Sequence, residues 1–134
     1  MKRLDLPIIE DYIYYIDYFK DDLQKELRNH FEQRPELPTA FVTGNDIIGA
    51  SAFFTLNQMG YKIPEDISII GFDNSTAARM TSPQLTTIHV KMERFGELAV
   101  ERLLQMIEDD NHEILKIQTG TSLMVRGTTA KPSR

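Results

Sequence analysis

One short run of residues constrains the fold of this chain more than any other feature. Residues 67–72 read Ile-Ser-Ile-Ile-Gly-Phe, which is a nearly continuous apolar stretch. Such a stretch is typical of a parallel β-strand that is covered on both faces of its sheet. In the first half of the chain, strand-like and helix-like segments alternate, and this alternation indicates a parallel sheet with right-handed crossovers. The sequence therefore predicts an α/β fold, an incomplete doubly wound parallel sheet.

The other expected elements follow from apolar spacing and from residues that begin or end helices. Asp21 or Asp22 is expected to cap a helix that Pro35 and Pro38 end. Gly60 is expected to end a second helix, which is apolar on more than one side. We expect strands at 11–16, 40–43, 67–72, 85–90, 114–118 and 122–126, and the later helices at 47–59 and 93–107.

Composition excludes several classes of protein. Fifteen basic and twenty acidic residues give a net charge of −5, which argues against a nucleic-acid-binding surface on these residues. The chain has no cysteine, so disulfides and thiolate metal sites are excluded, and this fits a reducing compartment. No apolar run approaches the roughly 20 residues of a membrane helix, and the first residues do not resemble a signal peptide.

Polar side chains follow three of the expected strands. The first strand ends at Asp17, Tyr18 and Phe19, the second at Gly44, Asn45 and Asp46, and the third at Asp73 and Asn74. In open parallel sheets, ligands bind beyond the carboxyl ends of the strands, so these residues are expected at one edge. Carboxylate, amide and aromatic groups together suit a polar, ring-shaped ligand.

A structural interpretation stays open for each of these residues. Asn45 and Asp46 are also suitable helix caps, Asp73 and Asn74 are common turn residues, and Phe19 is a candidate for the core.

Enzyme chemistry has little support in the sequence. The three histidines lack metal-ligand spacing, and neither a nucleophile-elbow motif nor a phosphate-binding glycine loop is present. A triad of Ser75, His89 and Asp73 can be written down, but any chain of this size yields such a set.

An ordered set of motifs covers nearly the whole chain. It comprises Pro-Thr-Ala at 38–40, Asn-Asp at 45–46, Ile-Pro-Glu-Asp-Ile-Ser at 63–68, Gly-Phe-Asp at 71–73, Pro-Gln-Leu-Thr-Thr-Ile at 83–88, the helix from Gly96 to Leu104, and Arg-Gly-Thr-Thr at 126–129. Each motif alone is weak, but in this order they resemble the C-terminal part of the effector-binding region of the lactose-repressor/galactose-repressor family of transcription regulators.

The resemblance implies a periplasmic-binding-protein-like (type I) lobe. Residues 1–134 would form part of an effector-binding domain, mostly its C-terminal lobe, with a helix at 92–109 that belongs to the first lobe in the family. The implied protein is a cytoplasmic homodimer that senses a small molecule, a sugar or sugar derivative. It would reach DNA only through an N-terminal helix-turn-helix domain absent from these residues. No membrane, metal, cofactor or catalytic role is implied.

Individual roles are also implied by the resemblance. Asp73 and Asn45 match positions that bind the effector, and Phe19 matches an aromatic that stacks on it. Asp46 and Asn74 stand at positions that support the turns, although Asp is common in the family where this chain has Asn74, a departure that is tolerated. Val90 departs from the pattern, because many members carry glutamine there, and this leaves the identity of the effector open.

Two rival functions remain: an exported sugar-binding protein of a transport system, and a small α/β enzyme. We also expect self-association through the helix at 47–59 and the segment 73–83. The apolar stripe formed by Phe95, Ala99, Leu103 and Met106 is expected to be buried, either against this chain's own sheet or against a second copy.

Overall fold

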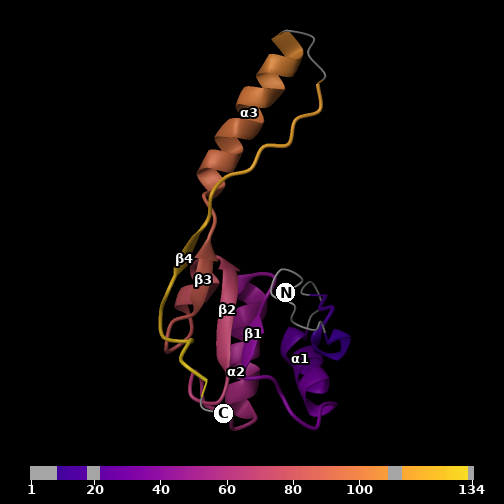
Figure 1. Ribbon diagram of the computed structural model, residues 1–134, viewed down its shortest axis with the longest axis vertical. Helices are drawn as coiled ribbons and strands as arrows, with labels where there is room; N and C mark the ends of the chain where they lie inside the picture. The colour runs from indigo at the N-terminus through magenta and orange to yellow at the C-terminus, as the bar shows by residue number, and fades with distance from the viewer. Residues whose placement is uncertain (1–8, 18–21, 109–112, 133–134) are drawn as a thin grey trace.

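The computed structural model describes residues 9–17, 22–108 and 113–132. Figure 1 shows a small sheet with helices beside it and one long helix that extends away from it. In chain order the elements are η2 (Glu10–Tyr12), α1 (Leu23–Glu32), β1 (Ala40–Val42), α2 (Asp46–Gln58), β2 (Ser68–Asp73), η3 (Thr76–Arg79), β3 (Thr86–His89), α3 (Met92–Glu108) and β4 (Ser122–Met124).

The strands form one sheet in the order β1-β2-β3-β4. β1 and β3 both pair with β2 in parallel, whereas β4 pairs with β3 in the antiparallel direction. Parallel neighbours require a crossover, and α2 supplies it between β1 and β2. The predicted α/β class with an open, mostly parallel sheet is confirmed.

The core lies between α2 and one face of the sheet. Leu56 of α2, Ile69 of β2 and Leu85 before β3 are fully buried there. Gly71 permits this close approach, because a Cβ at that position would collide with the side chains of Asp46 and Leu85. On the opposite face Phe72 stays 38% exposed, so helix cover on both faces is not found in the described residues.

Helix α1 begins and packs as its sequence predicts. The Asp22 side chain accepts a hydrogen bond from the backbone N–H of Lys25 at 3.0 Å, which caps the helix. Leu27 and Phe31, one turn apart, are both buried in the core. The Phe31 ring also contacts Tyr14, and burial raises the pKa of the Tyr14 hydroxyl.

The predicted strand at 11–16 is wrong. Residues 10–12 form a 3₁₀ turn, and the residues after it pair with no strand in the described part of the chain. Tyr14 explains why, since its ring packs on His30, Phe31 and Phe41 and anchors the segment by side-chain contacts instead of backbone hydrogen bonds. Residues with high strand propensity form a strand only where a neighbouring strand pairs with them.

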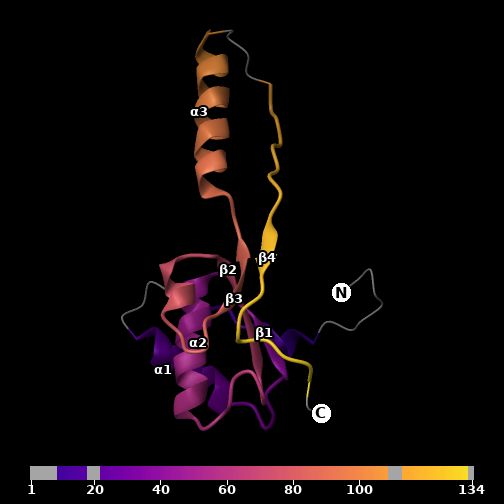
Figure 2. The same ribbon diagram turned by 90° about the vertical axis from the view of Figure 1, so that its left-hand side faces the viewer.

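The C-terminal part of the chain differs from expectation in two ways. Residues 114–118 form no strand, and β4 is shorter than the predicted 122–126. Figure 2 shows the segment after α3 returning alongside that helix before it reaches the sheet as β4. The Arg102 guanidinium donates to the carbonyl of Glu113 at 2.7 Å, which holds the returning segment to α3 and away from any strand.

Helix α3 leaves the sheet and exposes its apolar stripe. Phe95 is 41% and Leu103 57% exposed, Ala99 is exposed, and Met106 is half-buried. The prediction that this chain's own sheet buries the stripe is therefore wrong. β3 leads into α3, which lies beyond the end of the sheet. Among the described residues outside α3, Leu115 and Ile117 of the returning segment border the stripe. Within the described ranges, no helix is long and apolar enough to cross a membrane.

Candidate functional site

A cleft of about 630 Å³ opens where β2 and β3 end and α3 begins. This is the edge at which open parallel sheets bind ligands. Most of its lining residues have polar or charged side chains; the lining comprises Asp73, Asn74, Ser75, His89, Val90, Lys91, Met92, Glu93, Arg94 and Glu97. We take this cleft as the candidate functional site.

Asp73 ends β2 at the mouth of the cleft. Its φ is 100°, a left-handed value that is rare for a residue other than glycine. Strain of this kind persists only where surrounding contacts impose it, and it is concentrated at functional sites. No described residue is hydrogen-bonded to the Asp73 carboxylate. The backbone therefore holds an unpartnered acceptor at the cleft.

Asn74 also has a positive φ, 55°, and its polar groups are all engaged. Its N–H donates to Thr87 Oγ1 at 3.3 Å, and its Oδ1 accepts from the Arg126 guanidinium at 2.5 Å. Its Nδ2 lies 3.3 Å from His89 Nδ1. These contacts tie the end of β2 to β3 and to the chain after β4.

Asp46 lies beneath the cleft with 1% of its surface exposed. One carboxylate oxygen accepts from the backbone N–H of Ser75 at 2.6 Å, and the other accepts from the Thr87 hydroxyl at 2.5 Å. The side chain thus joins the start of α2 to the ends of β2 and β3. This arrangement fixes the loop that carries Asp73.

Asn45 precedes α2 and caps it. Its Oδ1 accepts from the backbone N–H of Ile48 at 2.9 Å. Its Nδ2 has no hydrogen-bond partner among the described residues, and Asn45 does not border the cleft as these residues form it. The structure therefore brings Asp73 and Asn74 into the cleft and places Asn45 on the neighbouring strand end.

Phe19 lies outside the described residues. The neighbouring aromatics Tyr12, Tyr14 and Tyr15 line a separate hollow of about 290 Å³ beside β1. This hollow continues the aromatic packing of Phe31, and most of its lining residues are aromatic or aliphatic.

Sequence reasoning missed two groups in the cleft. The Ser75 hydroxyl oxygen is buried without a partner in the described residues, and such an atom calls for a water or a ligand. His89 was considered only as a catalytic or structural residue, yet it borders the cleft as the in-register neighbour of Asp73. The sequence did place His89 near the end of an expected strand, and this position could have indicated a residue of the ligand site.

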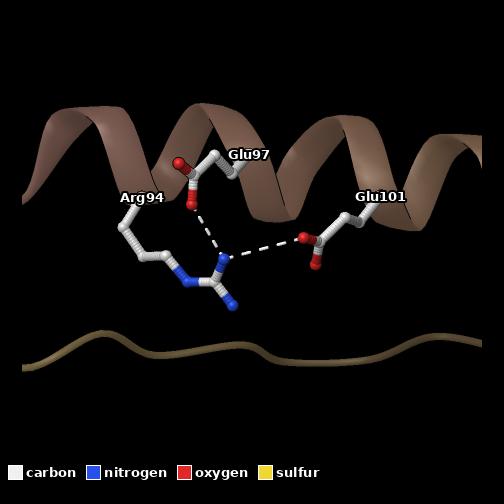
Figure 3. A network of polar contacts seen from close by, with 3 residues as sticks. All are labelled: Arg94, Glu97 and Glu101. Carbon is white, nitrogen blue, oxygen red and sulfur yellow. Dashed lines mark hydrogen bonds and ion pairs between the residues drawn. The ribbon is translucent and has the colours of Figure 1, made fainter.

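The first turns of α3 add charge to the rim of the cleft. Figure 3 shows Arg94 reaching toward Glu97 and Glu101. Its Nη1 lies 2.8 Å from Glu97 Oε2 and 3.6 Å from Glu101 Oε1. The hydrogen bond with Glu97 and the charge of Glu101 raise the pKa of Arg94. Because the three side chains are about half exposed, solvent screens these pairs, and they orient the rim without adding much stability.

Comparison with known proteins agrees with this geometry. The family described as "Periplasmic binding protein-like domain" matches residues 4–129. The HTH-type transcriptional repressor PurR of Photobacterium profundum is 36% identical over 108 residues, which is 81% of this chain and 32% of that protein. PurR of Photorhabdus laumondii is 32% identical over 126 residues, which is 94% of this chain and 37% of that protein. The chain thus spans about a third of the length of these relatives.

Solved structures show the same similarity. The transcriptional regulator CelR in complex with cellobiose matches with a TM-score of 0.83 at 26% identity, over 95% of this chain and 38% of that one. A LacI family transcriptional regulator of Enterococcus faecium with bound ribose matches with a TM-score of 0.69 at 26% identity, over 84% of this chain and 41% of that one.

Fold, cleft and comparisons together define the class as an effector-binding domain. The chain belongs to the periplasmic binding protein-like family, and it is similar to part of lactose-repressor/galactose-repressor-type transcription regulators.

Proposed function

We propose that this chain binds a small polar effector in the cleft between the strand ends and α3, and that binding controls a DNA-binding domain elsewhere in the protein. The observation that carries the proposal is the unpartnered Asp73 carboxylate, held at a strained φ in that cleft. A strained, polar strand end serves no packing purpose, whereas it suits a ligand with hydrogen-bond donors.

The proposed effector is a sugar or a sugar derivative. Asp73 accepts from ligand hydroxyls, and the buried Ser75 hydroxyl can donate or accept. Asn45 is proposed as a further contact through its Nδ2, and Phe19 as the aromatic that stacks on the sugar ring. The cellobiose and ribose complexes of the two solved regulators support this class of ligand. Asp46 and Asn74 are proposed to hold the turns.

Coupling to DNA binding would pass through the start of α3. The cleft is lined on one side by the sheet and on the other by α3 residues such as Arg94 and Glu97. A ligand that bridges the two sides would favour one angle between α3 and the sheet, which is a hinge-type population shift. We propose that α3 belongs to the first lobe of the complete domain, because none of its residues is buried by the described part of this chain.

We further propose that the protein acts as a homodimer in the cytoplasm. Ile47 and Phe54, two turns apart on α2, and Met80 in the 73–83 segment remain exposed and offer an apolar contact surface. Phe53, the residue before Phe54, cannot contribute to this surface, because it is buried in the core.

The test uses the protein at the length its gene encodes. Its affinity for DNA from its own promoter region is measured by fluorescence anisotropy with and without D-ribose and cellobiose, in the wild type and in Asp73→Asn. We expect one of the sugars to change the DNA affinity at least about ten-fold and Asp73→Asn to remove that response. Sugar binding without any DNA affinity would favour a transport component instead, and an unchanged response in Asp73→Asn would contradict the proposed site.

A further inference from the structure

We propose that His89 is a second effector-binding residue of the cleft, a hydrogen-bond donor that acts beside the acceptor Asp73. This inference rests on the proposed function and adds the chemistry that the cleft selects. A carboxylate and an imidazole N–H side by side recognise two adjacent hydroxyl groups on a sugar ring.

The first step is the orientation of the Asn74 amide. The Arg126 guanidinium has only donors, and it lies 2.5 Å from the Asn74 side-chain oxygen. A second contact from Arg126 to the carbonyl of Leu85, at 2.9 Å, fixes the guanidinium itself. The amide oxygen must therefore face Arg126, and the amide NH₂ must face the opposite way.

The second step is the tautomer of His89. The Asn74 NH₂ lies 3.3 Å from His89 Nδ1, and an amide NH₂ can only donate. Nδ1 must then accept, which places the proton of the neutral ring on Nε2. The contacts from Arg126 to Asn74 and from Asn74 to His89 therefore make His89 Nε2 a hydrogen-bond donor.

The third step is the direction of that donor. His89 borders the cleft, and no described residue is hydrogen-bonded to its Nε2. Asp73 and His89 are register partners at the ends of the parallel strands β2 and β3, about 4.8 Å apart at the backbone, and both border the cleft. The cleft thus presents an acceptor and a donor as a pair.

This pair suits a vicinal diol. One hydroxyl donates to the Asp73 carboxylate, and the oxygen of the next accepts from His89 Nε2. A ligand with a single hydroxyl, or with two that are not adjacent, engages only half of the pair.

The tautomer is tested first, and without any ligand. Long-range ¹H–¹⁵N NMR spectra of the His89 ring should show Nε2 protonated and Nδ1 bare at a pH where the ring is neutral. In Arg126→Met the amide of Asn74 is released, and the two tautomers should become mixed. A wild-type ring protonated mainly on Nδ1, or an unchanged tautomer in Arg126→Met, would overturn the inference that these contacts set the tautomer of His89.

Binding is tested with D-ribose and cellobiose on the protein at the length its gene encodes. His89→Leu should lower the affinity for the sugar that binds by about ten-fold, which is the effect of one lost hydrogen bond. His89→Gln should restore most of the affinity, because its amide NH₂ reaches the position of Nε2. His30→Gln, a change of the same residue type on α1 and outside the cleft, serves as the matched control and should bind as the wild type does.

The outcomes separate the two proposals. Equal affinity in His89→Leu and the wild type overturns the role of His89 and leaves the proposed function intact. Failure of both sugars to bind the wild type overturns the diol assignment together with the sugar effector. Loss in His89→Leu with recovery in His89→Gln supports a donor at this position, which a merely structural histidine would not show.

Discussion

At the scale of single residues, two aspartates near the same cleft differ in their surroundings. Asp46 is almost fully buried and accepts hydrogen bonds from Ser75 and Thr87. Asp73 is partly exposed and has no partner among the described residues. A buried carboxylate with two donors is a structural element, whereas an accessible carboxylate without a donor is free to bind a ligand.

Removing the Asp46 carboxylate should therefore destabilise the fold. Asp46→Ala leaves the Ser75 N–H and the Thr87 hydroxyl without an acceptor, and we expect the free energy of unfolding to fall by about 2–4 kcal/mol. Urea unfolding followed by circular dichroism measures the change.

Asp73→Asn is the matched control for that experiment. It removes one negative charge from the same loop region and keeps a residue that tolerates positive φ, so the free energy of unfolding should change by less than about 0.5 kcal/mol. Equal destabilisation by the two substitutions would contradict the division between a structural and a ligand-binding aspartate.

From the residues alone a structural role stayed open for both aspartates, and only the resemblance assigned Asp73 to the effector and Asp46 to a turn. The Asn-Asp pair after an apolar strand predicts a helix start, and Asn45 is indeed the cap. The burial of Asp46 depends on Thr87, which is 41 residues away along the chain, and no local pattern encodes that contact. Arg126 and Asn74 are 52 residues apart along the chain, and no local pattern encodes their contact either.

At the scale of elements, the start of α2 has two roles: it stabilises the helix, and it lies beside the proposed ligand site. Asn45 caps the helix through its oxygen, and its nitrogen is available to a ligand. The two roles can be separated, because serine also caps helices but lacks an amide N–H.

We expect Asn45→Ala to lower the free energy of unfolding by about 1 kcal/mol and Asn45→Ser to change it by only a few tenths. Both variants should weaken sugar binding, since both remove the Nδ2 donor. Thermal unfolding and sugar titration of the two proteins measure these effects. Full sugar affinity in Asn45→Ser would restrict Asn45 to capping.

The elements that were predicted correctly are those whose own residues specify them. Helix α1 has its cap and its four-residue apolar spacing, and β2 has its apolar run. The segments 11–16 and 114–118 have strand-like residues but pair with no strand in the described structure. Pairing is a property of the neighbourhood and cannot be read from the segment alone.

At the scale of the whole molecule, the chain has a packed body and a protruding arm. Helix α3 and the returning segment extend from the sheet, and no residue of α3 is buried. An isolated helix of this length is marginal in water, so α3 draws little stability from the rest of the described chain.

Amide hydrogen exchange should reveal this difference within the 134-residue chain. The amides of α3 should exchange orders of magnitude faster than those of α2, which is packed against the sheet. Equal protection of the two helices would mean that something covers α3, and a second copy of the chain would then be the first candidate.

Self-association through α2 is a separate prediction at this scale. Phe54 is 38% exposed on the outer side of α2, and Phe54→Lys places a charge in the proposed contact. We expect the dimer dissociation constant, measured by sedimentation equilibrium on the protein at its encoded length, to rise at least about ten-fold. Lys62→Glu, a charge change in the loop after α2, should leave the constant near its original value. An unaffected dimer in Phe54→Lys would move the interface elsewhere.

The central claim is that the cleft beside Asp73 binds a sugar-like effector, and calorimetric titration tests it most directly. D-ribose and cellobiose are titrated into the wild type and into Asp73→Asn, both at the length the gene encodes. We expect that at least one sugar binds the wild type and that Asp73→Asn binds it at least about ten-fold more weakly, with an unchanged unfolding temperature. Binding of equal strength in the two proteins, or no binding of either sugar to the wild type, would contradict the claim.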